Sequence, residues 1–449
     1  MKKLIALACL LWLTPLIVSN MTANISLGGM ATAAEEKKKT RRVPAMREAT
    51  YKRLAEAQIM IDPESTPREE GEPAPEPKGT PHDAIVLLLK LKDRRGLNSY
   101  ELAQVWNTLA FAYYTVEDVP NTIRSYENVL LQGAITEALE QTALRSLFQL
   151  YYSQEQYLKS IEFMDKWETL RGKPDAGVTF IKSTAYYQLN RFRDALKNAL
   201  LVEQIALQNQ KKIKENWWYL QVVLYNELEE SDNVIGVLEK LIVNYPKKQY
   251  WMHIAGMYDE KNMDDQALSA YHAVYLQGMM TKESELVMLA QRMLNAEVPY
   301  ESSVILEKGL KSKVVERSEK NLKLLATSYT MAQEMSKAID AWRAATKITE
   351  DAELHYHLAQ ALANEDRHEE ASAAYGDAVK IGKLKKLGDV HFWHGISLMQ
   401  LERWDKAIKA FRASAKADKK KAKQVRKYVR YINGEKRRQK ELRKMLAGE

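Results

Sequence analysis

Residues 354–380 read LHYHLAQALANEDRHEEASAAYGDAVK, and they contain the pattern that decides the fold. Ala359 is followed twelve positions later by Ala371, and four positions after that by Tyr375. The same triplet recurs as Ala255, Ala267 and Tyr271, as Ala326, Ala338 and Trp342, and as Gly395, Ala407 and Phe411. A fixed internal period indicates stacked copies of one supersecondary unit, rather than a compact domain around one site.

The spacing suits a pair of antiparallel helices. The two small residues let the helices approach closely, and the aromatic residue one turn further on fills the gap to the next pair. These residues resemble the tetratricopeptide repeat, which has small residues at positions 8 and 20 and a large one at position 24. In that register position 8 falls at Ala110, Phe148, Ser183, Val222, Ala255, Ala290, Ala326, Ala359 and Gly395. The resemblance implies nine repeats over residues 96–421, in an all-α solenoid that forms a right-handed superhelix of antiparallel helix pairs.

Positions 20 and 24 follow in the same register. Position 20 is Thr122, Ser160, Ala195, Val234, Ala267, Ser302, Ala338, Ala371 and Ala407, and position 24 is Tyr126, Met164, Ala199, Leu238, Tyr271, Leu306, Trp342, Tyr375 and Phe411. Phe148 and Val222 are large where the pattern requires a small residue, so we expect those two helix pairs to splay. Strand signals are nearly absent, and the chain should be almost entirely helical.

The amino terminus has the features of a targeting segment. Lys2 and Lys3 precede an apolar run over residues 4–18, and small residues end at Ala34, just before the charge of Glu35. We expect residues 1–34 to be a secretory signal peptide that directs the chain to the periplasm. Its cleavage would remove the single cysteine, Cys9. A retained inner-membrane signal anchor is the alternative.

Between this leader and the repeats, the pattern predicts two helices separated by a loop. Residues 35–42 are charged, residues 44–61 and 82–95 are expected to be helical, and residues 62–81 hold six of the twelve prolines. A stretch so rich in proline and glutamate cannot bury a core, which predicts a disordered loop inside a degenerate helix pair over residues 35–95. The loop is either an insertion without function or an extended docking segment.

Positive charge is concentrated in the last part of the chain. The whole chain has a formal net charge of +8, whereas residues 416–449 contain fourteen Lys or Arg against four Asp or Glu. Repeat arrays need a terminal helix that covers the last apolar face, and Val425, Tyr428, Val429 and Ile432 form a suitable stripe within residues 422–449. The cations are then solvated, or they contact an anionic membrane or an acidic partner. No nucleic-acid-binding motif is present.

The sequence contains no enzyme signature and no cofactor motif. A phosphate-binding glycine loop, a nucleophile elbow and a metalloprotease helix are all missing, so we expect a noncatalytic protein. His355, His357, His391 and His394 cluster in repeats eight and nine, but no carboxylate spacing supports a metal site there. We therefore predict that no metal is bound.

Partner binding in such arrays usually uses the concave face, which the first helix of each pair lines. Tyrosine offers broad contact area at low conformational cost, which suits holding a peptide or a helix. The alternative is that these side chains only pack the stack. A chaperone-type carboxylate clamp is absent, because position 6 holds no asparagine. The candidate contact residues at positions 5 and 12 are Tyr114, Tyr152, Tyr187, Phe180, Tyr219, Tyr356 and Phe392.

Several segments also resemble one particular group of repeat proteins. Similarity to gamma-proteobacterial tetratricopeptide proteins encoded beside TonB, ExbB and ExbD is found in the leader and in residues 96–107 (GLNSYELAQVWN), 214–220 (KENWWYL), 245–252 (YPKKQYWM) and 276–289. This resemblance implies a periplasmic accessory to the TonB system, acting in uptake of iron siderophores or haem. A scaffold for polysaccharide, peptidoglycan or outer-membrane biogenesis is the alternative.

Overall fold

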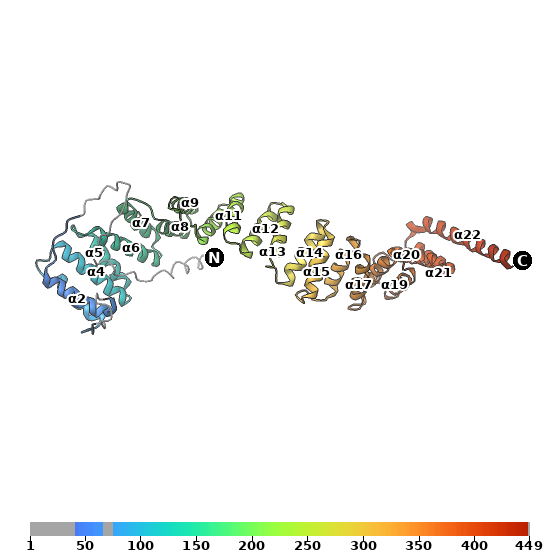
Figure 1. The fold of residues 1–449 in the computed structure, drawn as a ribbon, viewed down its shortest axis with the longest axis horizontal. Helices are drawn as coiled ribbons and strands as arrows, with labels where there is room; N and C mark the ends of the chain where they lie inside the picture. Colours follow the sequence, from blue (N-terminus) through green and yellow to red (C-terminus); the bar gives the residue numbers. More distant parts are fainter. Residues whose placement is uncertain (1–40, 66–74, 448–449) are drawn as a thin grey trace, which may run out of the picture. The chain divides into compact units, whose positions relative to one another are not determined.

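The computed structural model describes residues 41–65 and 75–447. The predicted leader, residues 35–40 of the charged stretch and residues 66–74 of the proline-rich loop therefore lie outside the described residues. The chain divides into two compact units, Met1–Tyr245 and Pro246–Glu449. Figure 1 shows their helices in order along the chain.

Every regular element in the described residues is helical, so the expected all-α tetratricopeptide-type solenoid is confirmed. No described helix is long and apolar enough to cross a membrane. The first unit contains α2 (Glu48–Ile61), the 3-10 turn η1 (Pro63–Ser65), α3 (Pro81–Lys92), α4 (Ser99–Thr115), α5 (Val119–Leu130), α6 (Glu137–Ser153), α7 (Tyr157–Arg171), α8 (Ala176–Gln188), α9 (Phe192–Gln208), α10 (Glu215–Glu227) and α11 (Ser231–Asn244).

The second unit continues the same alternation of helices and short turns. It contains α12 (Lys248–Glu260), α13 (Asp264–Leu276), α14 (Glu283–Asn295), α15 (Pro299–Lys311), α16 (Glu319–Met331), α17 (Met335–Thr346), α18 (Ala352–Asn364), α19 (His368–Ile381), α20 (Leu387–Gln400), α21 (Trp404–Ala417), the 3-10 turn η2 (Lys419–Lys421) and α22 (Ala422–Ala447). From α4 to α11 in the first unit and from α12 to α21 in the second, each even-numbered helix packs against the odd-numbered helix that follows it.

The repeat register places its small residues where the two helices of a pair cross. Every residue at positions 8, 20 and 24 is buried. Where one of the crossing residues is serine, its hydroxyl reaches the main chain of the other helix. Ser160 donates to the carbonyl of Phe148 at 2.7 Å, and Ser302 donates to that of Ala290 at 2.7 Å. The two helices of a pair are therefore close enough for a side chain of one to bond the main chain of the other directly.

This close approach holds even where position 8 is large, so the predicted splaying at Phe148 is wrong. Phe148 is buried and its ring meets Trp167 edge to face, with centroids 6.2 Å apart. The Phe148 ring packs on α7, and its carbonyl still accepts from Ser160 on that helix. Val222 is likewise buried, as is Val234 at position 20 of the same repeat.

The turn between paired helices is the same in all nine repeats. The residue seven positions after position 8 has a left-handed backbone with φ between 53° and 60°, and in no repeat is it glycine. The next main-chain N–H then donates to a carbonyl five residues back, as from Asp118 to Tyr113 at 2.8 Å. These residues are Glu117, Glu155, Asn190, Glu229, Asn262, Glu297, Gln333, Asp366 and Glu402.

The helix pair α2 and α3 precedes the first repeat, with bounds that differ from those predicted. Helix α2 begins at Glu48 rather than at residue 44, because Arg47 is extended and is held by other contacts. Helix α3 begins at Pro81 with a capping box in which Thr80 and Asp83 satisfy each other's main-chain N–H groups. The predicted loop is therefore ordered at its end.

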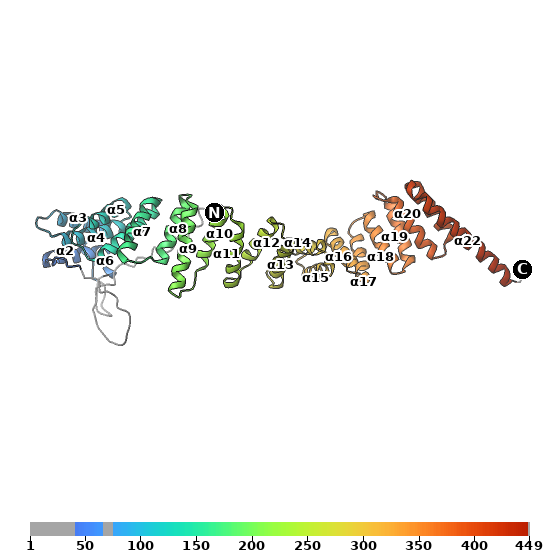
Figure 2. The ribbon, with the colours of Figure 1, turned by 90° about the horizontal axis from the view of Figure 1, so that it is seen from above.

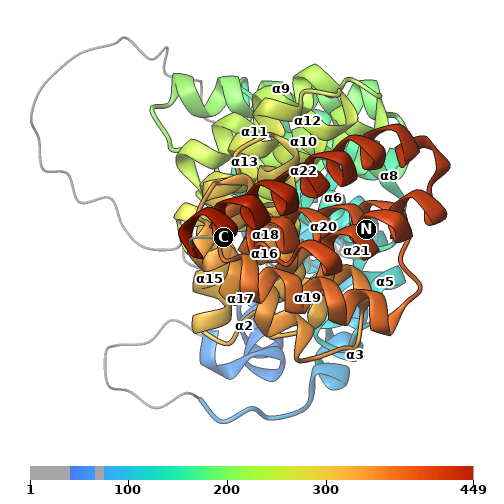
Figure 3. The ribbon, with the colours of Figure 1, turned by 90° about the vertical axis from the view of Figure 1, so that its right-hand side faces the viewer.

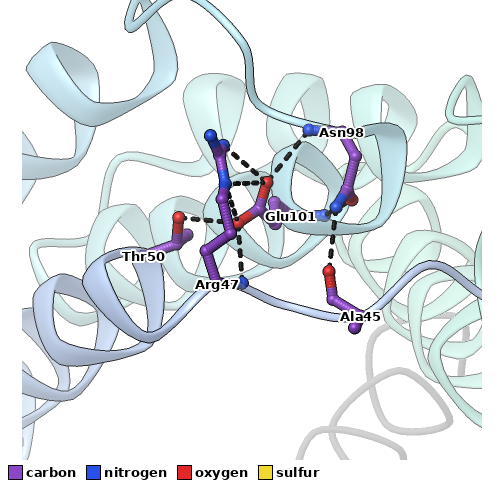
Figure 4. A network of polar contacts seen from close by, with 5 residues as sticks. All are labelled: Ala45, Arg47, Thr50, Asn98 and Glu101. Atoms are coloured by element: carbon purple, nitrogen blue, oxygen red, sulfur yellow. Dashed lines mark hydrogen bonds and ion pairs between the residues drawn. The ribbon is translucent and has the colours of Figure 1, made fainter.

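A buried carboxylate fixes α2 to α4 (Figure 4). The Glu101 side chain is 0% exposed and accepts from the Arg47 guanidinium, at 2.7 Å from Nη2. It also accepts from the Thr50 hydroxyl at 2.8 Å and from the main-chain N–H of Asn98 at 3.0 Å. Asn98 in turn donates to the carbonyl of Ala45. This network ties the segment before α2 to the start of the first repeat.

The contribution of this contact to the stability of the fold should depend on pH. Hydrogen bonds from Arg47, and then from Asn98 and Thr50, lower the pKa of Glu101 from 4.5 to about 2 despite its burial. A lowered folded-state pKa stabilises the fold above pH 4.5, and this contribution is lost as pH falls from 4.5 toward 2. We expect the wild type to lose on the order of 3 kcal/mol more than Glu101→Gln over that range, measured by chemical unfolding. Glu239→Gln, a change at an exposed site, is the control and should keep the wild-type pH dependence. If Glu101→Gln also shows the pH dependence of the wild type, the prediction is wrong.

Helix α22 closes the second unit over its first half. Val425 and Ile432 are 4% and 0% exposed and contact the last repeat, where Phe392 and Phe411 are also buried. The Tyr428 ring stacks on Phe411 with centroids 5.2 Å apart. Figure 3 views the chain from this end, with α22 nearest the reader.

Candidate partner-binding face

Five of the seven candidate contact residues lie on the first helices of the first unit's repeats, α4, α6, α8 and α10. Positions 5 and 12 are seven residues apart, which is about two helical turns, so both fall on one face of the helix. Asn107 and Tyr114 are such a pair on α4, and Arg145 and Tyr152 are the pair on α6. We call the surface that these positions form on α4, α6, α8 and α10 the first-helix face.

Two tyrosines at position 12 reach this face. Tyr114 is 36% exposed. Tyr152 is half-buried, its hydroxyl lies 3.0 Å from the Thr184 hydroxyl on α8, and its ring meets Tyr157 edge to face at 5.3 Å. Neighbouring repeats therefore hold the Tyr152 ring in one orientation, so little side-chain freedom would be lost when it contacts a partner.

Two aromatic residues at position 5 extend the face. Tyr219 on α10 is 39% exposed. Phe180 on α8 is half-buried, and its ring lies 6.4 Å from that of Trp217. Together with Tyr114 and Tyr152, these residues give the first-helix face an apolar surface carried on rigid helices.

Three other candidates are buried and offer no exposed contact in this structure. Tyr187 is 1% exposed, because its ring packs on Phe192 at 5.7 Å, and burial followed by the charge of Glu227 raises its pKa. Tyr356 and Phe392, in the second unit, are 9% and 4% exposed. Periodicity assigns such residues to a helix face, but it does not distinguish packing against the next helix from exposure.

Polar side chains lie among the exposed aromatic ones. Arg145 is exposed, and within residues 41–65 and 75–447 it forms no ion pair. Asn226 is exposed at position 12 of α10, two turns from Tyr219. A guanidinium can bind a carboxylate with two hydrogen bonds, and a carboxamide can both donate to and accept from a peptide group. The face thus combines apolar contact with main-chain and carboxylate recognition.

Two of the four clustered histidines of repeats eight and nine are packed against aromatic rings. His357 stacks on Trp342 at 5.0 Å, and His394 stacks on Tyr375 at 6.0 Å. Burial, with a smaller effect of His391, lowers the pKa of His394 to about 4. In the part of the chain that the structure describes, no three His, Cys, Asp or Glu side chains gather as a metal site. These histidines fill the aromatic layers between repeats.

A cleft on another side of the first unit was not anticipated from the sequence. It measures about 550 Å³ and is lined by α5, α6 and α7, with Leu144 and Leu170 beside Glu140 and Asp165. Glu140 forms an ion pair with Arg41, and Asp165 pairs with Lys182 at 2.6 Å. The negative charges of these two carboxylates are thus already neutralised by ion pairs with basic side chains. Attention to the first helices alone could not have revealed it, because α5 and α7 are second helices of their pairs.

The similarity of this chain to known proteins is limited to repeated helix hairpins. No protein-family model matches the chain, and no curated protein matches it. A crystal structure of MamA is 23% identical, with a TM-score of 0.33 over 38% of this chain and 97% of MamA. YrrB, described as a TPR protein with an unusual peptide-binding site, is 16% identical, with a TM-score of 0.34 over 43% of this chain and 97% of YrrB.

A third solved structure covers more of the chain. The TPR2AB domain of yeast Sti1, in a complex named with pHSP90, is 13% identical, with a TM-score of 0.27 over 66% of this chain and 98% of that domain. Likeness at this level identifies no partner. The tetratricopeptide-type fold of this chain rests on its own buried positions 8, 20 and 24.

Proposed function

We propose that this chain is a noncatalytic interaction scaffold that binds an extended segment of a partner protein on the first-helix face. The observation that carries this proposal is that Tyr114 and Tyr219 are exposed on the same first-helix face as Arg145, which forms no ion pair within the described residues. Aromatic and arginine side chains dominate the binding energy of protein interfaces. Rigid helices that display them lose little conformational entropy on binding.

We further propose that the partner belongs to a TonB, ExbB and ExbD energy-transducing system, and that the chain acts in the periplasm after export. This part of the proposal rests on the resemblance of residues 96–107, 214–220 and 245–252, and on the leader-like residues 1–34. A periplasmic accessory of that system would hold one of its components during iron-siderophore or haem uptake.

Replacing Tyr114, Tyr152 and Tyr219 with alanine together should weaken partner capture by at least about tenfold, because three anchors of the first-helix face are removed. Tyr187 is left unchanged, since its burial would make its loss a test of folding. Pull-down from cell envelopes with mass spectrometry measures the capture. Growth on a siderophore as sole iron source measures the cellular effect, against a deletion strain.

The control replaces Tyr51 and Tyr300, which are 57% and 53% exposed and belong to α2 and α15, helices that do not form the first-helix face. Both variants should keep the helical content of the wild type. Equal capture by the two variants would refute the proposed face. Normal growth of the deletion strain on every iron source, with recovery of cell-wall or polysaccharide proteins, would refute the TonB assignment and leave the face intact.

A further inference from the structure

The distal part of α22 extends beyond the repeats that its first half covers (Figures 1 and 2). Its last hydrogen bonds to the array come from Gln439, which accepts from Trp404 at 3.0 Å and donates to Glu402 at 3.1 Å. Residues 441–446 are all exposed. The helix therefore continues for about two turns beyond these bonds, with its side chains exposed.

This exposed end is apolar along one side. Leu442, Met445 and Leu446 are 54%, 75% and 80% exposed, and their i, i+3, i+4 spacing places them on one helical stripe. At about 100° per residue, the stripe is turned by roughly a quarter of a circle from the face of Val425 and Ile432 that packs on the array. The stripe therefore overlaps the capping face only in part: Leu446 follows Tyr428 by five full turns, whereas Leu442 and Met445 lie to one side of it.

The opposite side of the same helix is strongly basic. Ala422–Ala447 contains ten Lys or Arg against two Glu. Lys440 and Lys444 lie about half a turn of the helix away from the apolar stripe. Within the described residues Arg437, Lys440 and Arg443 form no ion pair. Their charge is therefore available to an anionic surface.

We propose that the distal segment of α22, residues 440–447, is an interfacial helix that binds the surface of membranes rich in anionic phospholipid. Leu442, Met445 and Leu446 would enter the boundary of the acyl chains, while Lys440, Arg443 and Lys444 would pair with headgroup phosphates. The segment lies in the plane of the surface, since no described helix can span a bilayer.

A lipid surface fits this segment better than a protein does. Three apolar side chains bury far less than the about 800 Å² that a stable protein interface takes from each partner. Membrane attraction instead adds a contribution from every cation near the surface. A second copy of the helix is disfavoured, because both copies would carry the same excess of positive charge. The inference does not depend on the partner of the first-helix face.

A position-specific probe tests the proposal in the full chain. In a Cys9→Ser background, Met445→Cys labelled with a polarity-sensitive dye should shift its emission to shorter wavelength with phosphatidylcholine vesicles that contain phosphatidylglycerol. Phosphatidylcholine alone should give little shift, and high salt should abolish the effect. The matched control is the same dye at Leu131→Cys, a 77% exposed site of the first unit, which should not respond.

Vesicle sedimentation gives the second measurement. Leu442→Glu with Leu446→Glu should reduce the phosphatidylglycerol-dependent binding at least about tenfold, whereas exposed Leu131→Glu with Val243→Glu should not. All variants keep the apolar residues 4–18, so the test compares only the differences in vesicle binding between variants. An unchanged emission at residue 445, or equal binding by both double variants, would overturn the proposal. A shift with polyglutamate but not with vesicles would do so as well, and would indicate an acidic polypeptide as the ligand.

Discussion

Removing the chain from Lys423 onward is expected to make the protein aggregate and to lower the unfolding temperature of the second unit. The cut exposes Phe392 and Phe411, which are 4% and 0% exposed in the intact protein. It also removes the fully packed Val425 and Ile432, each worth about 1.5 to 3 kcal/mol of apolar burial. The open end of a repeat array then presents a large apolar surface, which favours association between molecules.

Light scattering and calorimetry measure this effect, and a shorter truncation is its control. Ending the chain after Gln439 keeps Val425, Tyr428 and Ile432, as well as the hydrogen bond from Trp404 to Gln439. That protein should remain a well-behaved species with the wild-type unfolding temperature. If the longer truncation behaves in the same way, α22 does not act as the cap.

Ala371→Trp is expected to destabilise the second unit by about 3 kcal/mol or more. Ala371 is 0% exposed at position 20 of repeat eight, where α19 crosses α18 near the equally buried Ala359. Serines at the corresponding positions of other pairs lie 2.7 Å from the facing carbonyl, so the crossing has no space for an indole. Overpacking of this kind forces the backbone to shift.

Chemical unfolding measures the change, and α19 supplies a matched control. Ala373 lies two residues further along the same helix and is exposed, so Ala373→Trp introduces the same side chain where it meets solvent. We expect that variant to stay within about 0.5 kcal/mol of the wild type. Similar losses for the two variants would show that Ala371 is not a site of close approach.

The helix pairs were predictable because their cause is local and periodic. Each copy repeats the same packing requirement. In repeat eight the pattern consists of the small residue Ala359, Ala371 twelve positions later and Tyr375 one turn further on. Gly395 shows the same constraint directly, since a Cβ there would lie 2.9 Å from the ring of Phe411. The left-handed turns had no such signature, because residues such as Glu117 and Glu402 adopt φ near 60° and 53° without being glycine. Hydrogen bonding of the helix end imposes that conformation.

The candidate face was predictable only in part. Repeat positions 5 and 12 identify a helix face, and Tyr114 and Tyr219 are indeed exposed on it. Tyr187 occupies the same repeat position as Tyr114 but is buried, because Phe192 covers its ring. Which of two equivalent tyrosines is covered depends on the size of a neighbour on another helix, and a single repeat does not contain that information.

The sequence alone therefore determined the all-helical fold, the repeat register and the apolar stripe of the terminal helix, since each follows from spacings within one or two helices. The tertiary structure alone decided that Arg47 and Thr50 reach Glu101, because only folding brings the start of α2 to the start of α4. It also decided that α22 ends in an exposed basic and apolar segment, since a stripe in the sequence does not say where the surface it covers stops.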